Sequence, residues 1–271
     1  MANAQELSVD QFVALAARHG DNGLAYLREH YPRFVATRRL LLSNWTPPRN
    51  ARVLDIGAHW LHQALLYSLD GAEVTALDVA TTLDGPGVRS LAQAHGISLL
   101  PNEDLENPVA LGATADGTFD LVLFTEVIEH LAFNPVALWR ELYRVMKPGA
   151  RLVVTTPNYY ALRGRLRQWW RTIRGFGGGV PAEQVLELRT FSHHWKEYSR
   201  RELSRYFAQL SPDFECRKFA YTEEYMPAFL TRPGARVALA IERALPPLRP
   251  DMYLEVELAR KDKGIVVEPH W

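Results

Sequence analysis

The chain has 271 residues, enough to bury the core of one large domain. Its 31 basic and 31 acidic residues give a formal net charge of zero, so the whole chain gives no strong signal for nucleic-acid binding. The single cysteine, Cys216, excludes an internal disulfide and a thiolate metal cluster, and no apolar run reaches the ~20 residues that cross a bilayer. We therefore expect a cytoplasmic protein.

Residues 1–48 are predicted to form helices that precede the main domain of residues 49–271. Ser8 and Gln11 have the spacing of a capping box, and an apolar stripe at helical spacing follows them. The paired prolines Pro47 and Pro48 end the helical part. This N-terminal segment is expected either to cap a ligand pocket or to pack against the edge of a sheet.

The next segment predicts a βαβ unit. Apolar strands are expected at 52–56 and 73–78, with a helix at 60–69 between them. Gly57 lies at the first turn and Asp78 at the tip of the second strand. A glycine allows backbone amides to approach a ligand, and an acid after the next strand can accept hydrogen bonds from a ribose diol. The unit therefore suits a cofactor that contains a nucleoside.

Strands and helices continue to alternate up to residue 157, which favours a doubly wound, mostly parallel α/β sheet. Further strands are expected near 97–100, 120–124 and 151–156, and further helices near 87–95 and 135–146. The tripeptide Lys147-Pro-Gly149 is expected to close the last of these helices before the fifth strand. The C-terminal third predicts helix 200–210, strand 214–222, helix 234–244 and strand 252–260, and the two strands would complete a seven-stranded sheet.

These motifs together resemble the class I S-adenosylmethionine (SAM) methyltransferases over about residues 50–157. The resemblance rests on Val53-Leu-Asp-Ile-Gly57, Asp78, Phe119-Asp-Leu-Val-Leu-Phe124 and the segment from Val145 to Pro157 with its Lys-Pro-Gly turn. It implies a Rossmann-like methyltransferase fold with SAM as the cofactor. The cofactor-binding residues it implies are Asp55, Gly57, His59, Asp78, Asp104, Thr125 and Glu126. Asp104 would face the adenine amino group, although a solvated loop acid is an equal alternative.

The chain departs from the family at its central motif. His59 and Leu61 occupy the positions of the second and third glycines, where side chains are expected to crowd the methionine end of SAM unless the backbone is displaced. Two hypotheses follow. The first is an O-methyltransferase that acts on a small, sugar or lipid-linked acceptor. The alternative is a methyltransferase-like fold with lost or altered chemistry, acting as a binding or scaffold subunit.

A candidate metal site follows the fourth strand, in Thr125-Glu-Val-Ile-Glu-His130. If a helical turn begins here, Glu126, Glu129 and His130 project from one side of it. Two carboxylates and an imidazole suit a divalent cation. The alternative is that the glutamates cap the loop and His130 packs under the sheet.

A second histidine motif, Phe191-Ser-His-His-Trp-Lys-Glu-Tyr-Ser-Arg-Arg-Glu-Leu203, resembles a segment of two metal-using branches of the family. These branches are the ubiquinone-biosynthesis O-methyltransferases and the small-RNA 2′-O-methyltransferases. The resemblance implies a fourth metal ligand, His194 in one alignment or His193 in another, and we prefer His194. A similar segment occurs in sugar methyltransferases without an evident metal, so His130, His193 and His194 are also candidate catalytic bases.

Residues 158–195 are expected to form a helical insertion after strand five, a lid that carries acceptor specificity. Residues 160–174 hold five arginines and the pair Trp169-Trp170 in an amphipathic pattern. This pattern suits peripheral contact with an anionic membrane, or a lid over a phosphorylated acceptor, or a packed helix with an arginine-rich solvent face. The glycines between 175 and 179 predict a hinge.

Overall fold

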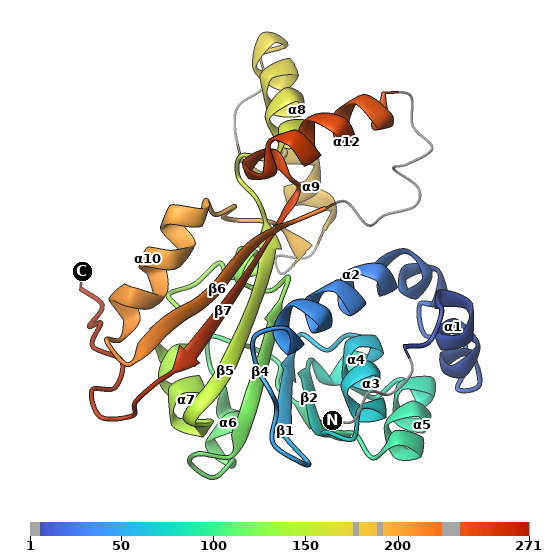
Figure 1. Cartoon of the computed structure of the whole chain (residues 1–271), viewed down its shortest axis with the longest axis vertical. Helices are drawn as coiled ribbons and strands as arrows, with labels where there is room; N and C mark the ends of the chain where they lie inside the picture. The colour runs from blue at the N-terminus through green and yellow to red at the C-terminus, as the bar shows by residue number, and fades with distance from the viewer. Residues whose placement is uncertain (1–5, 176–178, 189–191, 224–233, 271) are drawn as a thin grey trace.

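The computed structural model describes residues 6–175, 179–188, 192–223 and 234–270. Its centre is a seven-stranded sheet with the order β3-β2-β1-β4-β5-β7-β6 (Figure 1). The strands are β1 (Arg52–Ile56), β2 (Glu73–Asp78), β3 (Ser98–Pro101), β4 (Phe119–Thr125), β5 (Met146–Pro157), β6 (Phe214–Thr222) and β7 (Asp251–Leu258). Strands β1 to β5 are parallel, and β7 runs antiparallel to both β5 and β6. The predicted fold class is confirmed.

Helices cover both faces of this sheet. They are α1 (Val9–Ala17), α2 (Leu24–Leu42), α3 (His62–Leu69), α4 (Ala80–Leu83), α5 (Pro86–His95), α6 (Val109–Gly112), α7 (Val136–Val145), α8 (Leu162–Ile173), α9 (Ala182–Glu187), α10 (Arg200–Leu210) and α12 (Ala235–Ala244), with 3₁₀ turns η1 (Ile128–His130) and η3 (Pro246–Leu248). Helices α1, α2, α3 and α5 pack on one face, whereas α7 and α10 pack on the other. Within β4, Val122 belongs to one core and Leu123 to the other, which is why the strand is a continuous apolar run.

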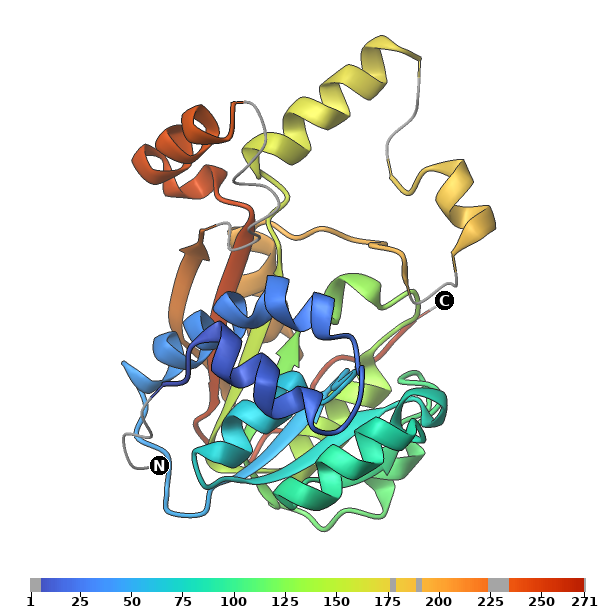
Figure 2. The same ribbon diagram turned by 90° about the vertical axis from the view of Figure 1, so that its right-hand side faces the viewer.

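The N-terminal helices form as the sequence predicts. Ser8 caps α1 with the expected capping box, because its side chain accepts from Gln11 and the Gln11 side chain accepts from the Ser8 backbone. Helix α2 continues through Pro32 and lies across α3 (Figure 2). A buried ion pair between Arg38 of α2 and Asp70, the C-cap of α3, joins the two helices.

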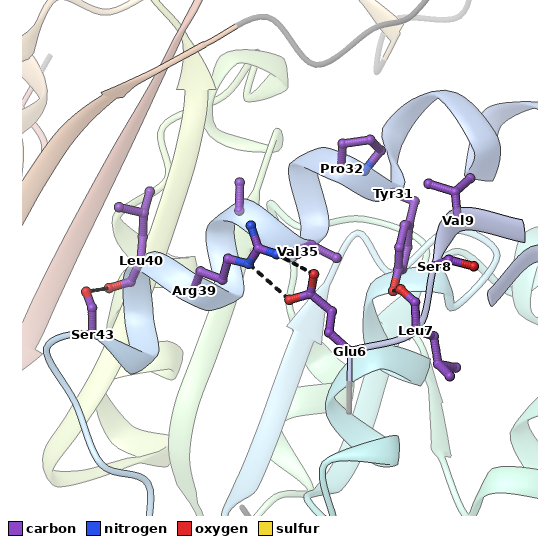
Figure 3. A pocket seen from close by; sticks show the side chains of 11 residues that line it. Glu6, Leu7, Ser8, Val9, Tyr31, Pro32, Val35, Arg39, Leu40 and Ser43 are labelled. Carbon is purple, nitrogen blue, oxygen red and sulfur yellow. Dashed lines mark hydrogen bonds and ion pairs between the residues drawn. The ribbon is translucent and has the colours of Figure 1, made fainter. Parts of the chain in front are cut away.

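The outer side of α2 carries a separate groove of about 610 Å³. In Figure 3 the N-terminal segment runs along this groove, where Tyr31 donates to the carbonyl of Leu7 and Arg39 pairs with Glu6. No described residue lines both this groove and the cavity described below, so the α2 side chains of the groove serve as controls for those of the cavity.

One local prediction differs from the structure. Lys147-Pro-Gly149 does not form a turn before the fifth strand but lies inside β5, where the pairing with β4 shifts register between Phe119 and Leu121. Gly149 has φ +80°, so the irregular segment depends on a glycine. The basic segment of residues 160–174 contains a helix, α8, as expected, and α8 protrudes with α12 beyond the sheet (Figures 1 and 2). The hinge expected between 175 and 179 is not tested, because residues 176–178 lie outside the described residues.

Among the described residues, the structure contains no helix long and apolar enough to span a membrane.

Candidate active site

A cavity of about 880 Å³ opens at the carboxyl ends of β1, β2, β3 and β4. Its wall includes the predicted cofactor residues Asp55, Gly57, His59, Asp78, Asp104, Thr125 and Glu126, together with the predicted base His130. Helix α2 contributes Tyr26, Arg33 and Phe34 to the same wall. The cavity therefore lies where ligands bind in doubly wound sheets, at the ends of the strands.

The loop after β1 keeps the backbone of a glycine motif although two of its glycines are missing. Gly57, His59 and Leu61 all have left-handed φ angles, of +72°, +49° and +65°. A side-chain-bearing residue in this region costs roughly 1–2 kcal/mol, so the surrounding contacts hold the loop in place. The His59 amide donates to Asp78 Oδ2 at 2.8 Å, and the Leu61 amide donates to the Ala58 carbonyl at 2.8 Å.

The expected crowding by both side chains is wrong for Leu61. Leu61 is fully buried and packs in the core on the α3 side, so it leaves the cavity clear. His59 does line the cavity, where its ring lies against Trp60 with 3.6 Å between the ring centroids. The positions of the family glycines are thus compatible with a cofactor-sized space.

Three acids occupy different environments in the cavity. Asp78 accepts from the amides of His59 and Val79, which fixes its carboxylate at the tip of β2. Burial, and then the negative charge of Asp78, raise the pKa of Asp55 to about 8. Asp104 accepts from the Glu106 amide and the Asn107 side chain, so it caps its own loop while it also lines the cavity.

The histidine motifs converge at the end of β4. Ligand atoms of Glu129, His130 and His194 all lie within 4.8 Å of one another. Glu129 is fully buried; Thr156 donates to its Oε2 at 2.9 Å, and its Oε1 has no hydrogen-bond partner among the described residues. His130 Nε2 lies 3.9 Å from Glu129 Oε1. Glu129, His130 and His194 are called the Glu–His–His cluster below.

Glu126 stands apart from the Glu–His–His cluster. It has φ +55°, and the 3₁₀ turn begins only at Ile128, so the expectation that Glu126, Glu129 and His130 project from one side of a helical turn is wrong. Its carboxylate accepts from Thr155 at 2.7 Å and pairs with Arg33 at 3.1 Å. Nearby, Thr125 accepts from Gln63, which links the end of β4 to α3.

The tandem histidines point in different directions. His194 packs edge-on against His130, with 4.8 Å between the ring centroids. His193 is buried against Trp195, and only its carbonyl reaches His130, 3.1 Å from Nδ1. The structure therefore places His194, the histidine that the sequence favoured, beside Glu129 and His130. The catalytic and metal roles of these residues stay predictions.

Burial controls the charge of the Glu–His–His cluster. It raises the pKa of Glu129 well above its usual value, and the negative charge of Glu126 raises this pKa further. Burial also lowers the pKa of His130, with a further contribution from His194. For His194, burial lowers the pKa and outweighs the opposing effect of Glu126. Both imidazoles are therefore neutral at pH 7 and able to accept a proton.

The sequence reasoning missed Arg33, Tyr26 and His62 as cavity residues. Arg33 is the one arginine or lysine among the described residues of the cavity wall. Burial is the largest single effect and opposes the charge of Arg33, but Glu126 and several smaller charge interactions together outweigh burial and raise the pKa of Arg33. The seven-residue spacing of Tyr26 and Arg33, two turns of one helix, was a signal that could have found them. Burial, with the nearby His59, lowers the pKa of His62 to about 4, so this ring is neutral.

Comparison with known proteins agrees with the fold. A family model described as a methyltransferase domain matches residues 27–210, and the chain belongs to this family. It is an enzyme of the SAM-dependent methyltransferase class. The match begins inside α2, so it includes Arg33 as well as the strands that bear the cavity.

Curated relatives include the ubiquinone biosynthesis O-methyltransferase of Xanthomonas oryzae pv. oryzae strain PXO99A. It is 28% identical over 208 residues, covering 72% of this chain and 75% of the relative. Among solved structures, the geranyl diphosphate C-methyltransferase of Streptomyces coelicolor has a TM-score of 0.56 at 14% identity, covering 87% of this chain and 84% of that one. A SAM-dependent methyltransferase from Mesorhizobium loti has the same TM-score at 15% identity and covers 84% of this chain and 97% of that one.

The residues of the cavity fit SAM. The loop requires a glycine at Gly57, because a Cβ there would lie 2.8 Å from the side chain of Val127, another residue of the cavity wall. Six carboxyl side chains line the wall, against the single guanidinium of Arg33; they are Asp55, Asp78, Glu103, Asp104, Glu106 and Glu126. Such a wall complements a ligand that carries a sulfonium, an ammonium and only one carboxylate.

Proposed function

We propose that this methyltransferase transfers the methyl group of SAM to a hydroxyl oxygen. The observation that carries the proposal is the Glu–His–His cluster beside the cofactor-type cavity, with two imidazoles that burial keeps neutral. Methylation of an oxygen releases a proton, which a neutral imidazole within hydrogen-bond reach can accept.

The chain's part in the reaction is to bind and orient. Bound SAM supplies an electrophilic methyl group on a sulfonium for in-line displacement. Asp78 would accept the hydroxyls of the ribose, Gly57 would let the backbone approach, and Arg33 would pair with the carboxylate. Collinear placement of donor and acceptor can supply about 7–11 kcal/mol. His130 or His194 would then hold the acceptor hydroxyl and remove its proton.

A divalent cation gives a second version of the proposal, in which the two imidazoles bind the ion instead of acting as the base. Glu129, His130 and His194 would hold it, because one carboxylate and two imidazoles suit zinc, iron or manganese. The unpartnered Oε1 of Glu129 supports this role. Glu126 would join as a fourth ligand only by leaving Arg33. When bound, the ion would lower the pKa of the acceptor hydroxyl and orient a diol.

The acceptor class follows from the relatives. Because curated relatives are named ubiquinone biosynthesis O-methyltransferases, a phenol or catechol with an apolar tail is the first acceptor to test. Sugar acceptors are the second, since the segment around His194 also resembles that of sugar methyltransferases. The insertion of residues 158–195 would carry the choice between them.

The scaffold alternative makes a different prediction. Its motivation is the histidine in a glycine position, yet the left-handed backbone of Gly57, His59 and Leu61 supports a working cofactor loop. The variant His59→Gly distinguishes the scaffold hypothesis from the enzyme hypothesis. Much tighter SAM binding in the variant would favour a decayed site, whereas unchanged or weaker binding would favour a functional histidine loop.

Calorimetry with SAM and its product S-adenosylhomocysteine (SAH), followed by an acceptor panel, tests the proposed function. Wild type should bind both ligands and methylate oxygen; no binding at millimolar concentration would sink the proposal. His130→Ala should lose transfer by about 10²–10⁴-fold if the imidazole is the base. His95→Ala, at a partly exposed histidine of α5, is the matched control.

Metal content separates the two versions of the chemistry. The cation version is supported if purified wild type contains a stoichiometric metal ion and the Glu129→Ala variant does not. The cation version is wrong if wild type contains sub-stoichiometric metal and Glu129→Ala does not change this content. Only the acid–base role of the histidines would then remain.

A further inference from the structure

Large apolar side chains are exposed mainly at one end of this molecule. Of the 16 large hydrophobic residues that are exposed in the described part of the chain, 13 lie between Tyr159 and Leu245. The three others are Leu69, Val109 and Val266. Such a concentration marks an interaction surface rather than ordinary scatter.

Two helices present most of this apolar surface. On α8, Leu166, Trp169, Trp170 and Ile173 follow helical spacing, and each is more than half exposed. On α12, Val237 and Ile241 are one turn apart and also exposed. Each helix therefore has an apolar stripe that the body of the protein leaves uncovered.

An ion pair joins the two helices although they come from separate insertions. Arg163 Nε of α8 donates to Glu242 Oε1 of α12 at 3.0 Å, and Glu242 is only 2% exposed. Both views show α8 and α12 meeting at their bases and protruding beyond the sheet (Figures 1 and 2). We call α8 and α12 the two-helix unit.

The charge of the two-helix unit selects its partner. Helix α8 with its C-cap carries five arginines and no acid, and α12 adds Arg236 and Arg243 and one acid, Glu242. Three of these seven arginines pair with acids, Arg163 with Glu242, Arg165 with Glu197 and Arg243 with Glu223, so the two helices together keep an excess of positive charge. A second copy of the same surface would set arginines against arginines. An anionic lipid surface complements the arginines, and its interfacial region accommodates tryptophan and aliphatic side chains.

We propose that the two-helix unit docks on the surface of an anionic bilayer. Both helices, α8 and α12, insert apolar side chains into the bilayer. Arg165 of α8 pairs with Glu197 at 3.3 Å, three residues after His194, so α8 lies beside the segment that carries this histidine of the Glu–His–His cluster. Given the proposed function, the acceptor is then an amphiphile that reaches the cluster from the membrane.

Vesicle co-sedimentation tests this proposal with matched charge changes. The vesicles are phosphatidylcholine alone or mixed with phosphatidylglycerol. Wild type should bind the mixed vesicles only, and Trp170→Asp and Val237→Asp should each weaken binding by about tenfold or more. Val109→Asp makes the same change at an exposed residue of α6 and should bind as wild type does.

SAH calorimetry on every variant checks that the variant is folded. It also separates the two proposals, because a wild type that fails to bind SAH would contradict the proposed function and not the membrane docking. Intact SAH binding without vesicle binding would overturn membrane docking. Vesicle binding that Val237→Asp leaves unchanged would exclude α12. Self-association of wild type that both variants abolish would show that the surface meets a second copy. Slower hydrogen exchange in α8 with a water-soluble phosphorylated sugar, and no vesicle binding, would make α8 a lid.

Discussion

Arg33 Nη1 lies 3.1 Å from Glu126 Oε2, so an ion pair ties the N-terminal helix α2 to the loop after β4. Glu126 is one of four described residues other than glycine with positive φ, and Thr155 holds the other oxygen of its carboxylate. The pair thus fixes a strained backbone at the junction of the cofactor cavity and the Glu–His–His cluster. Helix α2 is consequently part of the cavity wall.

Arg33→Gln should weaken SAH binding by about 10–100-fold, because hydrogen bonds to charged groups contribute about 1.5–3 kcal/mol. Methylthioadenosine lacks the amino-acid end, so its affinity should change much less. Calorimetry with both ligands gives the ratio. Arg39→Gln makes the same change at a residue of α2 that lines the groove of Figure 3 and not the cavity, so it should alter neither affinity. Equal losses for both ligands in Arg33→Gln would contradict the assignment.

Gly23→Ala should disturb the cofactor loop from outside it. A Cβ at Gly23 would lie 2.3 Å from the ring of Trp60, which packs against His59. The variant should therefore lose about 1–3 kcal/mol of unfolding free energy to the clash and bind SAH less tightly. Gly20→Ala also places a side chain at a positive φ, but its Cβ would meet no atom within 4 Å. It therefore measures the cost of the backbone strain without the clash. Urea unfolding measures the difference; equal losses in both variants would refute it.

Asp70→Asn should destabilise the protein by about 3 kcal/mol or more, because it leaves Arg38 buried without its charged partner. Asp10→Asn removes the partner of Arg28 in an exposed pair and should cost less than about 1 kcal/mol. Urea unfolding of both variants measures these costs. A similar small effect in the two would mean that the Arg38–Asp70 pair does not anchor α2.

Glu129→Gln should change how stability depends on pH. Because burial and Glu126 raise the pKa of Glu129, the native state keeps its proton to higher pH than the unfolded chain does. Wild-type stability therefore falls as pH rises from the unfolded pKa of Glu129 through the folded one. The variant lacks this loss, so its stability relative to wild type should rise by about 1.4 kcal/mol for each unit of pKa difference.

The measurement is chemical denaturation at several values between about pH 5 and pH 8. Exposed Glu187→Gln on α9 corrects for the removal of one carboxylate. A relative stability of Glu129→Gln that falls with pH would contradict the assigned direction.

The sequence predicted the sheet well because both faces of its strands are buried and apolar, as in Val53-Leu-Asp-Ile. The error at Lys147-Pro-Gly149 arose because tertiary pairing with β4 extends β5 through a tripeptide that normally ends a helix. Leu61 was read as a cavity residue because spacing alone cannot tell that its side chain turns into the core. Arg33 was missed because its role depends on how α2 crosses the sheet, and local pattern contains no such information.

Transfer of a ¹³C-labelled methyl group from SAM tests the central claim most directly. Wild type, incubated with labelled SAM and catechols that carry apolar tails, or with sugar acceptors, should place the label on oxygen, as the carbon chemical shift of the product reports. His130→Ala should bind SAH as wild type does and transfer little label. Label on carbon or nitrogen, or undiminished transfer to oxygen by His130→Ala, would contradict the account.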